Sequence, residues 1–174
     1  LQSLYEKRLA TYPRTDSRYL TEDMEESLPS LCRTVASSLP FMEGQPLPVN
    51  AAQVIDSSKV SDHHAVIPTA EIAVADLDAL PTGERNILNM IAVRLLCAVG
   101  EPYTYSETAV TLECGGVSFT TKGHTVTAEG WKATEKAFLS TLKQKPKQED
   151  IPPVLPELSE GQRFDSAAAA LHEG

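Results

Sequence analysis

The spacing of hydrophobic residues predicts that residues 1 to about 100 are mainly helical. One set of apolar residues recurs at intervals of three and four, as on a single helix face: Met24, Leu28, Leu31, Val35 and Leu39. Pro29 interrupts this set, so we expect two short helices with Pro29 in the first turn of the second. A longer helix is predicted from about Thr82 to Val99, where Gly100 occupies the position of a C-terminal cap.

The pattern changes after residue 103 to an alternation of apolar and polar residues, which is typical of strands. The alternation runs from Ala109 to Phe119, and Gly115-Gly116 divides it, which is the two-residue signal of a β-hairpin. Residues 121–124 are predicted to form another turn, and the next strand would then begin near Val126.

The end of the chain is predicted to be a connector followed by a short tail. Trp131 and Phe138 are expected to anchor the edge of the sheet. Residues 143–162 combine charged residues with several prolines, which are excluded from helix interiors, so this stretch is a loop or an extended connector. Ala167–Ala170 favours helix, but few residues follow it. The predicted fold is α+β, with a helical domain at 1–100 and a β-strand domain at 101–174.

Composition excludes several classes of protein. With 41% hydrophobic and 22% charged residues, the 174-residue chain can form a core, which excludes full disorder. The most apolar stretch, residues 87–99, contains Arg94 and is shorter than the roughly 18 residues that span a bilayer. Cys32, Cys97 and Cys114 form no CxxC pair, which argues against a disulfide framework and suggests a reducing compartment.

Charge is distributed unevenly along the chain. The net charge of −9 argues against a general nucleic-acid binder. Residues 1–20, however, hold Lys7, Arg8, Arg14 and Arg18 against only two acidic residues. A local basic patch on an acidic body suits a binder whose affinity is confined to one groove.

Residues 11–19 form the densest polar cluster, with two arginines, three threonine or serine hydroxyls and two tyrosines: Thr11, Tyr12, Arg14, Thr15, Ser17, Arg18 and Tyr19. Arginine presents a fixed fork of donors to phosphate oxygens, and hydroxyls add neutral donors. A tyrosine in such a place could attack phosphorus. The alternative is a capped loop whose arginines pair with Asp16, Glu22 or Glu25.

A second cluster at residues 59–69 contains the adjacent histidines His63 and His64. Adjacent histidines can bind metal, but on a strand their side chains point to opposite faces, and no cysteine or second histidine pair supports a metal site. A histidine beside an acid can also carry a proton or donate to phosphate. A surface turn is the remaining alternative, and composition does not separate these choices.

Both clusters resemble motifs of a known enzyme family. Thr11–Leu20 resembles the active-site segment of type IA DNA topoisomerases, and the proline after the tyrosine resembles their topoisomerase III branch. Ser61–Thr69 resembles the second motif of that branch, about 50 residues later and in the expected order. Two later segments resemble the stretches that follow these motifs in the family: residues 123–131, and residues 155–158 with Gly161.

The resemblance implies an activity and roles for the motif residues. The family cuts one DNA strand by attack of the motif tyrosine on a phosphodiester, passes another strand and reseals the break without ATP. Tyr12 would be the nucleophile and Arg14 would neutralise the scissile phosphate. His63, with His64 as the fallback, would contact a neighbouring phosphate. The remaining predicted DNA contacts come from the same two segments: Thr15, Ser17, Arg18 and Lys59.

The resemblance also implies what lies outside the chain. The acidic residues that bind Mg²⁺ would belong to a toprim domain ahead of residue 1, and part of the DNA-gripping domain would follow residue 174. We therefore expect a central piece, a helical active-site tyrosine domain with part of an antiparallel β arch, that holds no metal and is inactive alone. Its unpaired sheet edge would favour self-association.

Partners and compartment follow from the same resemblance. Single-stranded DNA is the expected partner, and the cytoplasm, in association with the nucleoid, is the expected location. The alternative function is a non-enzymatic DNA-binding or mobilisation module that uses the same basic loop. A scaffold without nucleic-acid contact is a third possibility, which the acidic net charge favours.

Overall fold

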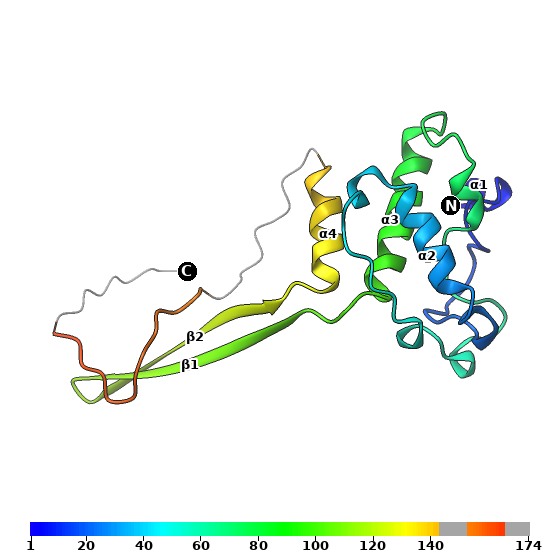
Figure 1. Cartoon of the computed structure of the whole chain (residues 1–174). Helices are drawn as coiled ribbons and strands as arrows, with labels where there is room; N and C mark the ends of the chain where they lie inside the picture. Colours follow the sequence, from blue (N-terminus) through cyan, green and yellow to red (C-terminus); the bar gives the residue numbers. More distant parts are fainter. Residues whose placement is uncertain (143–152, 166–174) are drawn as a thin grey trace. The chain divides into compact units, whose positions relative to one another are not determined.

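The described part of the chain, residues 1–142 and 153–165 of a computed structural model, divides into two compact units. One unit comprises Leu1–Thr104 with residues 128–142, and the other comprises Tyr105–Thr127 with residues 153–165. Helices form the first unit and a two-stranded sheet the second, so the chain is α+β (Figure 1). No helix among these residues is long and apolar enough to cross a membrane. Most of the predicted connector and Ala167–Ala170 lie outside the described residues.

The core of the first unit lies between α2 (Leu28–Ser37) and α3 (Thr82–Ala98). Each helix contributes apolar residues that are almost fully shielded from solvent: Leu28, Cys32 and Val35 from α2, and Leu88, Ala92, Leu95 and Leu96 from α3. Pro29 lies in the first turn of α2, where its missing N–H costs nothing, which confirms the sequence prediction. The long helix is confirmed as well.

Gly100 does not cap α3 in the way that the sequence suggested. The helix ends at Val99 with a right-handed backbone, and Gly100 does not adopt the positive φ of a glycine cap. Gly100 instead permits close packing, because an added Cβ would lie 3.3 Å from the Cβ of Trp131. The glycine therefore serves the contact between α3 and the start of α4 (Trp131–Ser140).

Residues 38–81 are much less helical than predicted. The chain between α2 and α3 contains, among described residues, only single-turn 3-10 helices: Pro40–Met42, Ala51–Gln53, Ser57–Lys59 and Ala70–Ala73. The first of the two short helices expected from the apolar set that begins at Met24 is likewise a single 3-10 turn, Glu22–Met24. Prolines at 40, 46 and 48 remove the donors that a continuous helix needs. The extended backbone between these turns positions the site described below.

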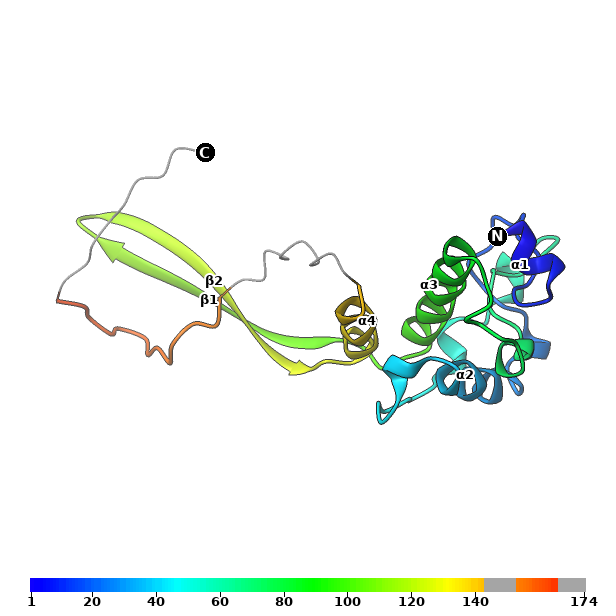
Figure 2. The ribbon, with the colours of Figure 1, turned by 90° about the horizontal axis from the view of Figure 1, so that it is seen from above.

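The expectation that Trp131 and Phe138 anchor a sheet edge is wrong, because both lie on helix α4, which contacts α3 (Figure 2). The ring of Phe138 lies against Phe41, with centroids 5.6 Å apart. Gly130 starts the helix with φ +48°, and a Cβ there would lie 2.2 Å from the carbonyl oxygen of Pro102. Glycine is therefore required at this turn.

The sheet of the second unit is a hairpin of β1 (Thr104–Cys114) and β2 (Val117–Ala128). Gly115 and Gly116 join the strands with φ values of +58° and +81°, as a type I′ turn requires, which confirms the predicted hairpin. The turn predicted at 121–124 is wrong, because β2 continues through it. Gly123 instead allows the segment 153–155 to approach β2, where His124 N–H donates to the carbonyl of Pro153 at 3.2 Å.

Candidate active site

The end of helix α1 (Gln2–Glu6) reverses the chain just before the tyrosine loop. Arg8 takes a left-handed conformation with φ +61°, its N–H donates to Tyr5 O at 2.8 Å, and Leu9 N–H donates to Leu4 O at 2.8 Å. These two bonds make a Schellman motif, and the accompanying apolar contact is provided by Leu4 and Leu9, which are both buried. The reversal sends the following residues back past α1.

The returning segment pairs with the second motif. Ala10 forms an antiparallel bridge with Pro68, and Thr11 N–H donates to the carbonyl of Ile67 at 3.0 Å. The hydroxyl oxygen of Thr11 accepts the Ile67 N–H at 3.0 Å, so side chain and main chain both join the segments. Two motifs that lie far apart in sequence are thereby fixed as neighbours immediately before Tyr12.

Two predicted DNA-contact residues make further links between the motifs. The hydroxyl of Thr15 donates to the carbonyl of His63 at 2.7 Å, and accepts the N–H of Ser17 at 3.0 Å. The hydroxyl of Ser17 lies 3.0 Å from the carbonyl of Lys59 and can donate to it. A hydroxyl that donates its hydrogen to a carbonyl has none left for a phosphate oxygen. In this arrangement both side chains hold the loop, and their contact with DNA stays a prediction.

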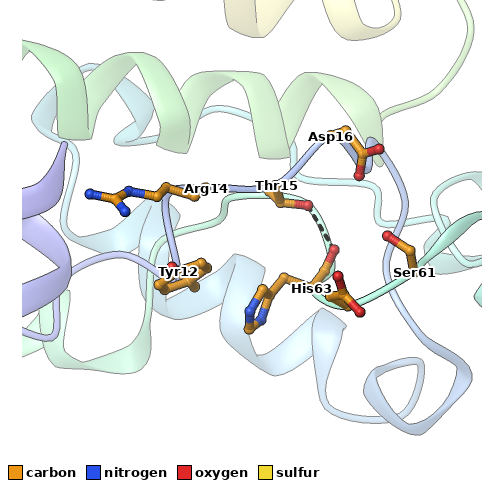
Figure 3. Close-up of a pocket in the computed structure, with 7 residues that line it drawn as sticks. Tyr12, Arg14, Thr15, Asp16, Ser61 and His63 are labelled. Carbon is orange, nitrogen blue, oxygen red and sulfur yellow. Dashed lines mark hydrogen bonds between the residues drawn. The ribbon is translucent and has the colours of Figure 1, made fainter.

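A cavity of about 570 Å³ opens where the motifs meet. It is lined by residues of both motifs: Tyr12, Arg14, Thr15, Asp16, Ser61, Asp62 and His63 (Figure 3). The rings of Tyr12 and His63 lie side by side, with centroids 4.2 Å apart and planes inclined by 40°. The site therefore brings together a phenol, a guanidinium and an imidazole from two segments.

The arginines of the tyrosine loop are exposed and available to an anion. Neither Arg14 nor Arg18 makes an ion pair with any residue of 1–142 or 153–165. The capped-loop alternative, in which they pair with nearby acids, is not the arrangement found. Arg14 lines the cavity and Arg18 does not. The cavity thus has one guanidinium whose fork of donors is free for a ligand.

Two other predicted contacts, His64 and Lys59, do not line the cavity. His64 Nδ1 lies 2.8 Å from the carbonyl oxygen of Ala65, so this ring faces the main chain. Lys59 Nζ lies 2.8 Å from Asp56 Oδ2 and 4.4 Å from the centroid of the Tyr19 ring. The hydrogen bond with Asp56 raises the pKa of Lys59, and the same bond lowers the pKa of Asp56. Of the adjacent histidines, only His63 meets Tyr12.

Sequence reasoning did not assign three residues of the cavity, Asp16, Ser61 and Asp62. Their adjacency to Thr15 and His63 was the available signal. Asp16 and Asp62 place two carboxylates in the lining of the cavity against the single guanidinium of Arg14. No group of three His, Cys, Asp or Glu side chains in the described part of the chain could hold a metal ion.

Comparison with known proteins points to one family. A family model described as DNA topoisomerase matches residues 1–174. DNA topoisomerase 3 of Bacillus licheniformis is 41% identical over 145 residues, which is 76% of this chain, and the Bacillus subtilis protein of that name gives the same values. DNA topoisomerase 3 of Staphylococcus aureus is 35% identical over 151 residues, or 84% of this chain. The chain spans about a fifth of the length of these curated relatives.

Proposed function

This chain belongs to the type IA family of DNA topoisomerases, and we propose that it carries the tyrosine with which the full-length protein cuts one DNA strand. The observation that carries the proposal is the convergence of Tyr12, Arg14 and His63 on one cavity. The guanidinium of Arg14 has no carboxylate partner among the described residues.

The reaction exchanges one phosphoester for another. The phenol oxygen of Tyr12 forms a bond to phosphorus as the bond between phosphorus and the 3′-oxygen breaks. The phenol loses a proton and the 3′-oxygen gains one, so the products are a 5′-phosphotyrosine and a 3′-hydroxyl. The reverse attack reseals the strand after another strand has passed. No bond energy is lost in the exchange, and ATP is not consumed.

Arg14 and His63 have separate parts in this scheme. A neutral phenol is a weak nucleophile, so the reaction needs help from neighbouring groups. One form of help is stabilisation of the negative charge that develops on the phosphate as the new bond forms. Arg14 supplies two parallel donors for this charge. His63, whose ring already lies beside Tyr12, donates an N–H to a phosphate next to the cut. Single-stranded DNA is the substrate that we propose, in keeping with a reaction that cuts one strand.

We propose that Mg²⁺ assists the full-length protein from residues outside the described part of this chain. The residues of the cavity do not fit such an ion, since Asp16, Asp62 and His63 line it but no three His, Cys, Asp or Glu side chains of the described residues are grouped closely enough to hold a metal. We therefore derive no step through the ion. For the same reason the 174-residue chain alone is expected to bind DNA without cutting it.

Covalent capture tests the proposal. The full-length protein is incubated with a labelled single-stranded oligonucleotide, denatured and mapped by peptide analysis, and the DNA is expected on Tyr12. Tyr12→Phe should retain DNA binding and lose the covalent product, because only the hydroxyl is removed. Tyr19→Phe is the matched control and should retain the product. A label on another tyrosine, or cleavage by Tyr12→Phe, would refute the assignment, and binding without any adduct would favour the DNA-binding module.

A further inference from the structure

The ring of Tyr12 has a second aromatic neighbour besides His63. Tyr5, on helix α1, lies edge-on to Tyr12, with ring centroids 5.4 Å apart and planes at 84°. Edge-to-face geometry is favourable because the positive edge of one ring meets the negative face of the other. The Tyr12 ring therefore contacts rings from two segments, one from α1 and one from the second motif.

The position of Tyr5 is fixed by the way α1 is anchored. Leu4 is fully buried in the core of the first unit, and Ser3 Oγ donates to Glu84 Oε1 of α3 at 3.0 Å. Lys7 forms an ion pair with the same carboxylate. The Schellman motif then folds the chain back so that Tyr12 returns to Tyr5. Tyr5 thus lies on a helix that is fixed by the buried side chain of Leu4 and by two contacts with Glu84 of α3.

Tyr12 itself lies on backbone without regular secondary structure. Its ring would otherwise turn freely between staggered rotamers, and only some of these direct the hydroxyl into the cavity. A nucleophile that is held near its attacking position reacts faster than one that must find it. Tyr5 does not line the cavity, and its ring contacts Tyr12, which does.

We propose that Tyr5 is a positioning residue that holds the ring of Tyr12 in its attacking orientation. The proposal rests on the proposed function of Tyr12 as the nucleophile. It assigns the effect to the aromatic ring of Tyr5 and not to its hydroxyl, because ring geometry defines the contact. Loss of the ring should therefore slow bond formation while leaving DNA affinity unchanged.

The test compares Tyr5→Leu with Tyr5→Phe in the full-length protein. Single-turnover formation of the covalent product and the dissociation constant for single-stranded DNA are measured separately, with melting temperature as the folding check. Tyr5→Leu should slow product formation about 2- to 10-fold, the range expected for an aromatic pair. Tyr5→Phe should restore the wild-type rate. If Tyr5→Leu fails to fold, Tyr5→Met, another strong helix former, repeats the comparison.

Tyr105→Leu is the matched control, because Tyr105 is also a half-exposed tyrosine that contacts another ring, stacked on His124 at 4.3 Å. It should leave the cleavage rate unchanged. Wild-type cleavage by Tyr5→Leu, equal slowing in Tyr5→Phe, or a change in DNA affinity that accounts for the slowing would each overturn the proposal. Failure of the proposed function would give a different result, because Tyr12→Phe would then still form the covalent product.

A second measurement detects the contact directly. Fluorotyrosine placed at position 12 reports on the environment of that ring through its fluorine resonance. Tyr5→Phe should leave the resonance unshifted, since the neighbouring ring is kept. Tyr5→Leu should shift it, since a nearby aromatic ring is removed. An unchanged resonance in a folded Tyr5→Leu protein would contradict the proposal independently of activity.

Discussion

The hydroxyl of Thr15 donates a 2.7 Å hydrogen bond to the main-chain carbonyl of His63, 48 residues further along the chain. The same oxygen accepts the N–H of Ser17, so one side chain shapes its own loop and ties it to the second motif. Because Tyr12 and His63 must share a cavity, this bond stabilises the arrangement of the site as well as the fold.

Replacing Thr15 with valine should lower the free energy of unfolding of the protein by about 0.5–1.5 kcal/mol, because the hydrogen bond to the carbonyl of His63 is lost. Thr15→Ser keeps the hydroxyl and should stay within about 0.5 kcal/mol of wild type. Urea denaturation measures both variants. Equal stability of Thr15→Val and Thr15→Ser would show that the bond contributes nothing to the fold.

The elements predicted correctly from sequence are those whose signal is local. Helix α3 is long and has an extended apolar face, and Gly115-Gly116 leaves few alternatives to a hairpin. Helix α4 was missed because its ten residues directly follow a strand and are stabilised by distant contacts, such as that of Phe138 with Phe41. The prediction of a turn at Gly123 is wrong because sequence alone does not separate a glycine that needs a positive φ from one that allows another segment to approach closely.

The site was predicted less completely than the motifs. The clusters around Tyr12 and His63 stand out by their polar composition, and the structure brings them into one cavity. The choice between His63 and His64 could not be made locally, because ring direction depends on how the backbone pairs with residues 9–11. Tyr5 was missed for the same reason, since its contact with Tyr12 arises only after the reversal at Arg8.

Arg8→Gly should stabilise the protein by about 0.5–1 kcal/mol relative to Arg8→Ala. The backbone at this position has φ +61°, which costs energy for any residue with a Cβ and none for glycine. Both variants remove the same charge, so the difference between their free energies of unfolding reports the effect of the backbone conformation. Thermal or urea unfolding gives the comparison, and a less stable glycine variant would contradict the strain argument.

Gly123→Ala should loosen the segment that follows residue 152 from β2. An added Cβ would lie 2.4 Å from Leu155 Cγ and 2.7 Å from the carbonyl oxygen of Pro153, too close for either to stay in place. Hydrogen exchange at His124 N–H, which donates to Pro153, should accelerate. Gly83→Ala is the control, because space around that glycine is open and the change should be neutral or slightly stabilising. Unchanged protection of His124 in Gly123→Ala would show that the segment does not depend on this contact.

The hairpin should weaken in acid through Glu107. Its carboxylate accepts a hydrogen bond from Lys122 Nζ at 2.9 Å and lies 2.9 Å from His124 Nε2. The bond from Lys122 is the main cause, and that from His124 the next, of a pKa for Glu107 below its ordinary value of 4.5. Because the pKa of Glu107 is lowered in the folded protein, the stabilisation that its carboxylate provides is fully present above the ordinary pKa of 4.5. That stabilisation is lost as the pH falls through the pKa of the folded protein.

Comparison of wild type with Glu107→Gln between pH 7 and pH 3 tests this dependence. The difference in melting temperature between the two proteins should shrink as the pH falls below about 4.5. Subtracting the curves removes the titration of other carboxylates, which both proteins share. Parallel curves over the whole range would mean that Glu107 has the same pKa in the folded and unfolded chains.

The two contributions of His63, its ring and its nitrogens, can be separated by substitution. His63→Phe keeps an aromatic ring against Tyr12 and removes the N–H donors, whereas His63→Ala removes both. A hydrogen bond to a charged phosphate is worth about 1.5–3 kcal/mol, so His63→Phe should reduce single-turnover cleavage by roughly 10- to 100-fold while the melting temperature stays near wild type. His63→Ala should be at least as slow.

His64→Ala is the comparison for His63, because that ring faces the carbonyl of Ala65 and not the cavity. Its effect on cleavage should be much smaller than that of either His63 variant. If His63→Phe cleaves at the wild-type rate while His63→Ala is slow, the imidazole acts only as a ring that holds Tyr12. If both His63 variants melt at lower temperature and cleave normally when folded, the histidine supports the loop and does not contact phosphate.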